Sequence, residues 1–173
     1  RTRELNLRFD TPEHELERGF RVLRLRMDTA ARMTYKGPAY GSQGVRVRQE
    51  IEFEVSDFES ARSLLQALGY RVSMVYEKYR AVYRLDEVDI ALDELPYGCF
   101  VELEGPDPES IHAVSDRLGL NWEASAPGSY AMLFEGLRTR MSLPFRDLTF
   151  QNFIKIDVSP ELLGVHPADE AHL

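Results

Sequence analysis

The sequence has 173 residues, a length that fits one domain or one domain with a tail. It is 43% hydrophobic and 29% charged, which allows a packed core and is typical of a water-soluble chain. Its net charge of −8 argues against general nucleic-acid binding, which depends on an excess of Lys and Arg. Because Cys99 is the only cysteine, the sequence excludes an intrachain disulfide framework and a cysteine-rich zinc site.

The sequence shows no membrane-spanning segment and no export signal. No apolar run approaches the roughly 20 residues that a bilayer span requires, and no signal-peptide pattern opens the sequence. We therefore expect a cytoplasmic protein that binds neither membranes nor nucleic acid. The basic residues are mostly arginines, and the lysines are Lys36, Lys78 and Lys155.

Strand patterns dominate the first 104 residues. Leu5, Leu7 and Phe9 alternate with polar residues before Thr11-Pro12 interrupts the run. Further extended stretches are expected at residues 20–27, 32–36, 45–55, 72–85, 88–92 and 100–104, with a loop at 37–44. About seven strands joined by short connections are typical of a closed antiparallel sheet.

Two helices are expected between these strands. Ser56 to Glu59 fits a capping box at the start of the first helix, and Gly69 marks its end. Asp107-Pro108 begins the second helix and Gly119 ends it. Each helix carries one apolar stripe, which predicts that one side of it packs on the sheet.

The sequence also contains an internal repeat at an offset of 50 positions. Each copy consists of a strand with Glu-x-Glu, a turn, a capped helix and Leu-Gly. The identical pairs are Glu52/Glu102, Glu54/Glu104, Asp57/Asp107, Glu59/Glu109, Ser60/Ser110, Leu68/Leu118 and Gly69/Gly119. Two copies predict a pseudo-symmetric domain rather than a solenoid, which needs three or more repeats.

The character of the sequence changes after Tyr130. A short helix is expected at 133–141, and residues 142–173 are expected to form an irregular extension. We therefore predict a domain over residues 1–141 followed by a C-terminal extension over 142–173. We expect this extension to pack either on the domain or on a partner. A homodimer is therefore one possible arrangement.

Charged residues recur at alternate positions on the expected strands. In the 45–55 segment one side carries Arg46, Arg48, Glu50, Glu52 and Glu54, because side chains alternate between the faces of a strand. A single charged side fits a solvent-exposed face. Its recurrence as Arg24/Arg26, Lys78/Arg80 and Glu102/Glu104 beside Asp93 instead predicts a charged interior with the helices outside.

An interior with both signs of charge suits a polyanion bound together with metal ions. Arg and Lys side chains neutralise phosphate oxygens, Arg often through two hydrogen bonds at once. Carboxylates bind hard divalent ions, and Mg²⁺ uses one or two of them together with substrate phosphates.

These motifs resemble the CYTH superfamily, also called triphosphate tunnel metalloenzymes. The matching segments occur in family order over roughly residues 4–135: Phe9-Asp10-Thr11-Pro12, Leu23-Arg24-Leu25-Arg26, Thr34-Tyr35-Lys36-Gly37-Pro38, Glu50-x-Glu52-x-Glu54, Lys78-x-Arg80, Leu92-Asp93, Val101-Glu102-Leu103-Glu104 and Ser129-Tyr130. The resemblance implies an α+β fold, an eight-stranded antiparallel β-barrel or tunnel with helices packed outside.

The resemblance also implies site residues. Phosphate-binding positions would be Arg24, Arg26, Lys36, Lys78 and Arg80, and the charged 45–55 face adds Arg46 and Arg48 as substrate-binding candidates. Lys78 and Arg80 are the catalytic candidates. The candidate ligands for Mg²⁺ or Mn²⁺ are Asp93, Glu102 and Glu104, with Glu52 and Glu54 as further carboxylates.

The implied activity is metal-dependent chemistry on ATP, tripolyphosphate or thiamine triphosphate. Class IV adenylyl cyclase activity, which forms cyclic AMP and pyrophosphate, and triphosphatase activity both fit. The Glu-x-Glu-x-Lys motif of the family's first strand is not matched: Glu4-Leu5-Asn6-Leu7-Arg8 holds only one carboxylate. We expect that this strand precedes the sequence given. A non-catalytic polyphosphate or nucleotide binder is the alternative.

Overall fold

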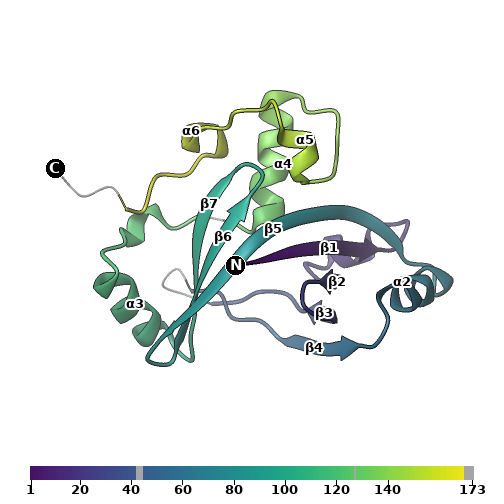
Figure 1. Ribbon diagram of the computed structural model, residues 1–173, viewed down its shortest axis with the longest axis horizontal. Helices are drawn as coiled ribbons and strands as arrows, with labels where there is room; N and C mark the ends of the chain where they lie inside the picture. Colours follow the sequence, from purple (N-terminus) through teal and green to yellow (C-terminus); the bar gives the residue numbers. More distant parts are fainter. Residues whose placement is uncertain (42–44, 127, 170–173) are drawn as a thin grey trace. The chain divides into compact units, whose positions relative to one another are not determined.

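The computed structural model describes residues 1–41, 45–126 and 128–169 (Figure 1). Its strands form one sheet in the order β4-β3-β2-β1-β5-β6-β7. The strands are β1 (Thr2–Asp10), β2 (Val22–Met27), β3 (Ala31–Lys36), β4 (Glu50–Val55), β5 (Arg71–Leu85), β6 (Val88–Leu95) and β7 (Gly98–Glu104). The pairs β1–β2, β2–β3, β3–β4 and β6–β7 are antiparallel.

Helices complete the described part of the chain. They are α1 (Glu15–Arg18), α2 (Phe58–Ala67), α3 (Pro108–Arg117), α4 (Tyr130–Met141), α5 (Phe150–Phe153) and α6 (Pro160–Leu163), with a 3₁₀ turn at Trp122–Ala124. The prediction of an antiparallel α+β fold with helices packed on the sheet is confirmed.

The chain divides into two compact units. The N-terminal unit comprises residues 2–79 and 146–149, and the C-terminal unit comprises residue 1, residues 80–145 and the chain from 150 onward. Strand β5 runs from the first unit into the second. Each unit is described by itself below.

In the N-terminal unit, α2 covers one face of the strands. Leu7, Phe9 and Leu25 of the sheet pack with Phe58 and Leu65 of α2 in a buried apolar cluster. Asp57 begins α2, because its side chain accepts a hydrogen bond from the backbone N–H of Ser60. This packing leaves the opposite face of the same strands for polar side chains.

The C-terminal unit repeats this arrangement. Val88 and Ile90 of β6 pack with Val114 of α3, and Asp107 begins α3 by accepting a hydrogen bond from the backbone N–H of Ser110. Gly69 after α2 and Gly119 after α3 both have a positive φ, 93° and 68°, which glycine adopts without steric cost. The 50-residue repeat is therefore structural: one copy stands in each unit.

Three features differ from expectation. The described residues supply seven strands rather than eight, with β4 and β7 at the two ends of the strand order. The expected 45–55 strand begins only at Glu50. Pro38 interrupts the ladder, because proline has no N–H to donate; beyond the Lys36–Glu50 pair the Gly37 N–H bonds to the Gln49 carbonyl and an isolated bridge joins Tyr40 to Val47. Of the expected loop, residues 42–44 lie outside the described residues.

The third difference concerns the expected irregular extension. It contains α5 and α6, and its residues 146–149 belong to the N-terminal unit. Leu148 is fully buried and exchanges backbone hydrogen bonds with Val75 and Glu77 of β5, at 2.9 Å each. The domain boundary at residue 142 stays a prediction.

Candidate functional site

The polar face of the N-terminal unit is built from cross-strand rows of side chains. Paired residues of an antiparallel sheet project to the same side. The β-sheet register therefore defines two rows: Arg8, Arg24, Thr34 and Glu52 in one, and Asn6, Arg26, Arg32 and Glu54 in the other. We call these residues, together with Glu4, Lys36, Glu50 and Lys78, the polar face.

Arg24 lies at the centre of this face and is only 9% exposed. Its guanidinium donates to the hydroxyl of Thr34 at 3.1 Å, to the hydroxyl of Tyr76 at 3.3 Å and to Glu52 at 3.4 Å. Burial lowers the pKa of Arg24. Tyr76 and the carboxylates of Glu52 and Glu4 raise it by more, so the net pKa lies above its ordinary value. The face therefore holds a buried, permanently charged cation.

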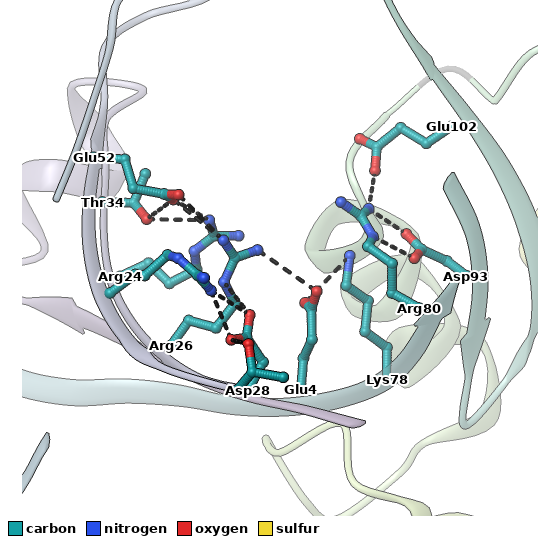
Figure 2. A network of polar contacts seen from close by, with 12 residues as sticks. Glu4, Arg24, Arg26, Asp28, Thr34, Glu52, Lys78, Arg80, Asp93 and Glu102 are labelled. Carbon is teal, nitrogen blue, oxygen red and sulfur yellow. Dashed lines mark hydrogen bonds and ion pairs between the residues drawn. The ribbon is translucent and has the colours of Figure 1, made fainter. Parts of the chain in front are cut away.

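Arg26 lies among three carboxylates at ion-pair distances. Its nitrogens are 3.3 Å from Glu52, 3.4 Å from Asp28 and 3.6 Å from Glu4 (Figure 2). These separations exceed the 2.7–2.9 Å of a good charge-assisted hydrogen bond. Arg26 thus has compensating charge around it without tight hydrogen bonds.

Arg32, in the same row, behaves differently. It binds both carboxylate oxygens of Asp28, at 2.6 and 2.7 Å, beside the turn that joins β2 to β3. Burial raises the pKa of Asp28, but the Ala30 backbone N–H and the charges of Arg32 and Arg26 lower it more, so the net pKa is lowered. Arg32 is committed to a structural ion pair, whereas Arg24 and Arg26 have only longer contacts to carboxylates.

Glu52 is the carboxylate that links Arg24 to Arg26. The Thr34 hydroxyl donates to its Oε2 at 2.7 Å. Burial raises the pKa of Glu52, but the Thr34 hydrogen bond and the arginine charges outweigh it and leave the pKa lowered. Glu52 is therefore ionised and surrounded by cations, which favours a role in orienting arginines.

Glu4 is a buried carboxylate that the sequence analysis did not assign to the site. It lies 3.6 Å from Arg26 and 3.5 Å from Lys78, and Figure 2 shows its carboxylate between these two cations. Lys78 is itself buried. The signal was available: Glu4 and Asn6 alternate with the core residues Leu7 and Phe9, so they had to share the opposite face.

The other predicted phosphate-binding residues lie at or beyond the edge of this face. Lys36 forms an ion pair with Glu50 at 2.8 Å. Glu54, a predicted metal ligand, also lies there, 3.6 Å from Arg32. Arg46 and Arg48 are exposed and precede β4, so the β-sheet register does not bring them into the rows. Their assignment to substrate binding stays a prediction.

A second cluster lies in the C-terminal unit, and we call it the carboxylate cluster: Arg80, Asp93, Glu102 and Tyr130. Arg80 binds both oxygens of Asp93 at 2.6 Å and also contacts Glu102 (Figure 2). The hydroxyl of Tyr130, the first residue of α4, donates to Asp93 at 2.8 Å. Burial raises the pKa of Tyr130, and the charges of Glu102 and Asp93 raise it further, so this hydroxyl remains a hydrogen-bond donor.

The β6–β7 register explains why these carboxylates meet. Phe100 pairs with Asp93 and Glu102 with Ala91, so Asp93 and Glu102 occupy adjacent positions on the face opposite Val88 and Ile90. Glu104, two residues further along β7, is on the same face and pairs with Asp89. The Tyr130–Asp93 hydrogen bond was not predicted from the sequence, although Ser129-Tyr130 stood out as a motif.

The carboxylate cluster has the donor chemistry that a hard divalent cation requires. Asp93 Oδ2 and Glu102 Oε2 both contact one nitrogen of Arg80, so two carboxylate oxygens converge on a single positive centre. Glu102 is 40% exposed at its side chain, which gives a cation and its waters access from solvent. These residues fit Mg²⁺ or Mn²⁺ better than Glu52, whose carboxylate faces arginines.

A third acidic group has a structural explanation. Asp10, His14 and Glu17 have potential ligand atoms within 4.8 Å of one another. However, the Asp10 carboxylate accepts the backbone N–H groups of Thr11, Leu16 and Glu17, at 2.8 to 3.0 Å. Asp10 thus holds the short helix α1 against β1, and nothing further indicates a metal there.

Comparison with known proteins identifies the family. The model of the CYTH domain matches residues 3–117, which is more than half of the chain. The chain belongs to the CYTH domain family, and the resemblance recognised in the sequence is confirmed. No helix in the described ranges is long and apolar enough to cross a membrane.

One curated relative is a proposed adenylate cyclase from Methanocaldococcus jannaschii. It is 32% identical over 86 residues, which are 49% of this chain and 46% of that protein. The chain therefore matches about half the length of this relative.

Solved structures share the fold. A Pyrococcus horikoshii protein has a TM-score of 0.62 and 28% identity, covering 74% of this chain and 79% of its own. A proposed adenylate cyclase from Vibrio parahaemolyticus has a TM-score of 0.63 and 23% identity, with 78% and 80% covered. A proposed adenylyl cyclase from Hippeastrum, described as having dominant triphosphatase activity, has 0.62 and 20%, with 96% and 87% covered. At these last two identities the likeness concerns the fold alone.

Proposed function

We propose that this chain carries the substrate-binding part of an Mg²⁺- or Mn²⁺-dependent enzyme that acts on a triphosphate compound. The observation that supports it most is the polar face, where the guanidinium groups of Arg24 and Arg26 are largely enclosed and their contacts to carboxylates are long. A phosphate group offers three oxygens for bidentate binding by guanidinium groups. Phosphate oxygens would replace these long contacts with shorter, charge-assisted hydrogen bonds.

The residues take different roles in this proposal. Arg24, Arg26 and Lys78 bind phosphate oxygens, with Lys36, Arg46 and Arg48 as further contacts. Glu52 and Thr34 hold Arg24 in place. Lys78 and Arg80 are the candidate catalytic residues, because a cation beside a phosphate group in transfer stabilises negative charge.

Asp93 and Glu102, with Glu104 beside them, are the proposed metal ligands, and Glu52 and Glu54 have weaker geometric support. A bound Mg²⁺ would offset negative charge on the phosphate oxygens and polarise the reacting phosphorus centre. In this chain Arg80 holds the two carboxylates together, and Tyr130 fixes the orientation of Asp93 by a hydrogen bond. These contacts aim both acidic groups at one position.

Two reactions fit this arrangement, and both names occur among the relatives. In a cyclase, the ribose 3′-oxygen of ATP bonds to the α-phosphorus, the bond to the β-phosphate breaks, and pyrophosphate leaves. In a triphosphatase, a water oxygen bonds to the terminal phosphorus and gives up a proton to solvent, the bond from that phosphorus to the bridging oxygen breaks, and the diphosphate leaves. The organic part of the substrate decides between them.

The direct test is turnover with Mg²⁺ or Mn²⁺ on ATP, thiamine triphosphate and tripolyphosphate, with cyclic AMP, ADP and phosphate separated chromatographically. Cyclic AMP with pyrophosphate would establish cyclase activity, and fastest phosphate release from tripolyphosphate would establish a triphosphatase. If all three compounds bound and none gave a product, the enzyme hypothesis would be wrong and the chain would be a non-catalytic binding module.

Two pairs of variants assign the roles. Arg24→Gln should weaken tripolyphosphate binding about tenfold to a hundredfold, since it removes charge-assisted hydrogen bonds. Arg62→Gln on α2, away from the polar face, is its matched control. Glu102→Gln should raise the Mg²⁺ concentration needed for half-maximal turnover about tenfold, while Glu87→Gln in the exposed β5–β6 turn should not. If Glu102→Gln and Glu87→Gln behaved alike, the metal assignment would be wrong.

A further inference from the structure

Asn6 is a fully buried, neutral polar residue on the polar face. It lies in β1, opposite Arg26 in the β-sheet register. Neither its amide nitrogen nor its amide oxygen has a hydrogen-bond partner among the described residues. Burying an amide without partners is unfavourable, and an apolar side chain of similar size would avoid that cost.

Two arginine nitrogens on the same polar face are also buried without a hydrogen bond in the described part of the chain. The Nε atoms of Arg24 and Arg26 are buried and also lack hydrogen-bond partners among the described residues. Directly paired residues of neighbouring antiparallel strands have Cβ atoms about 4.5–5.5 Å apart. The Nε of Arg26 lies 3.4 Å from Asp28 Oδ2, which is too long for a good charge-assisted hydrogen bond, and across the strand pair it faces the unused acceptor of Asn6.

The charge of the acceptor matters for an anion-binding face. Glu4, Asp28 and Glu52 already surround Arg26, and each negative charge there opposes the approach of a polyanion. The Asn6 amide is a neutral acceptor in the same surroundings. It can orient the guanidinium through Nε and leave its positive charge for the ligand.

We propose that Asn6 is a positioning residue that acts through Arg26. When phosphate oxygens bind the terminal nitrogens of Arg26, the Asn6 Oδ1 accepts the Nε–H and fixes the plane of the guanidinium. In the free protein this hydrogen bond is unmade: the Asn6 Oδ1 has no hydrogen-bond partner among the described residues, and the Arg26 Nε makes a long contact to Asp28. The proposal rests on the proposed function, because it assumes that the polar face binds the triphosphate.

The first test combines stability with affinity. In the full 173-residue chain, Asn6→Leu removes a buried amide that has no partner, so the melting temperature without ligand should stay equal or rise. Its tripolyphosphate dissociation constant, measured calorimetrically without metal, should rise about tenfold. Asn121→Leu is the matched control: Asn121 accepts a hydrogen bond from the backbone N–H of Glu123, so this variant should lose stability and keep its affinity.

A double-mutant cycle tests whether Asn6 acts through Arg26. Arg26→Lys keeps the positive charge but removes the guanidinium Nε–H. Asn6→Leu should therefore cost about tenfold in affinity in the natural chain and close to nothing when Arg26→Lys is already present. An equal tenfold loss in both backgrounds would show that Asn6 does not act through Arg26.

Other outcomes separate this inference from the proposed function. If Arg24→Gln abolished tripolyphosphate binding while Asn6→Leu left it unchanged, the role of Asn6 would be refuted and the anion-binding face would stand. If neither variant changed binding, the polar face would not be the binding site at all. A large loss of melting temperature in Asn6→Leu would show that the amide has a structural partner, and would also overturn the inference.

Discussion

Thr34 offers the sharpest test of how the polar face is held together. Its side chain is fully buried and links two charged residues: the hydroxyl donates to Glu52 at 2.7 Å and accepts from Arg24 at 3.1 Å. Thr34→Val keeps the shape and removes both hydrogen bonds. Hydrogen bonds to charged groups contribute about 1.5–3 kcal/mol each, and the second is long, so we expect a loss of about 3 kcal/mol in unfolding free energy.

For a chain of this length, 1 kcal/mol corresponds to about 2–4 °C in melting temperature, so Thr34→Val should melt about 9 °C lower. The assay is thermal and urea unfolding followed by circular dichroism. Thr139→Val is the control, because the exposed Thr139 hydroxyl donates only to a backbone oxygen within α4. A loss in Thr34→Val no larger than in Thr139→Val would refute the view that Thr34 organises the arginines.

The same substitution should change the response to acid. The folded-state pKa of Glu52 lies below its ordinary value of 4.5, so Glu52 stabilises the fold fully above that value, and its contribution is lost as the pH falls through the folded-state pKa. Thr34→Val removes a hydrogen bond that lowers this pKa. The stability difference between Thr34→Val and the natural chain should therefore shrink as the pH is lowered from neutral to about 3.

Three further predictions follow from the same geometry. Tyr130→Phe removes the donor to Asp93 and should lower the unfolding free energy by about 1–2 kcal/mol in urea titration; no change would mean that Asp93 does not need this contact. Arg32→Gln breaks the ion pair with Asp28 and should lower the melting temperature without changing tripolyphosphate affinity, unlike Arg24→Gln. Glu52→Gln should flatten the acid side of the stability profile, and an unchanged profile would assign that dependence to other carboxylates such as Asp28.

Much of the fold follows from local sequence signals. Asp107 was readable as a helix start, because an Asp side chain satisfies a free backbone N–H three residues on. The capping box at Ser56–Glu59 located α2, although the residue that caps the helix is Asp57, one position later. The alternation of Leu7 and Phe9 with polar residues predicted which side of β1 enters the core. The separation of an apolar face under helices from a charged face is therefore a property of the sequence pattern.

The contacts within the polar face could not be predicted from local sequence signals. They depend on the β-sheet register, which sets Thr34 between Arg24 and Glu52 and separates Arg32 from Arg24 in the neighbouring row. A shift of one residue would have moved each of these side chains to the other face. Arg46 and Arg48 likewise lie outside the rows because the regular β3–β4 pairing ends at Lys36 and Glu50.

The two copies of the repeat show how neighbours decide the chemistry of one motif. Glu52 and Glu54 of β4 face arginines on β2 and β3, so these carboxylates orient cations and suit a face that binds an anion. Glu102 and Glu104 of β7 share their face with Asp93 and Asp89 of β6, and Arg80 contacts two of these acidic groups. Because the excess charge is negative there, the same Glu-x-Glu pattern suits a divalent cation. In the proposed function, the first copy therefore takes a phosphate-binding role and the second copy a metal-binding role.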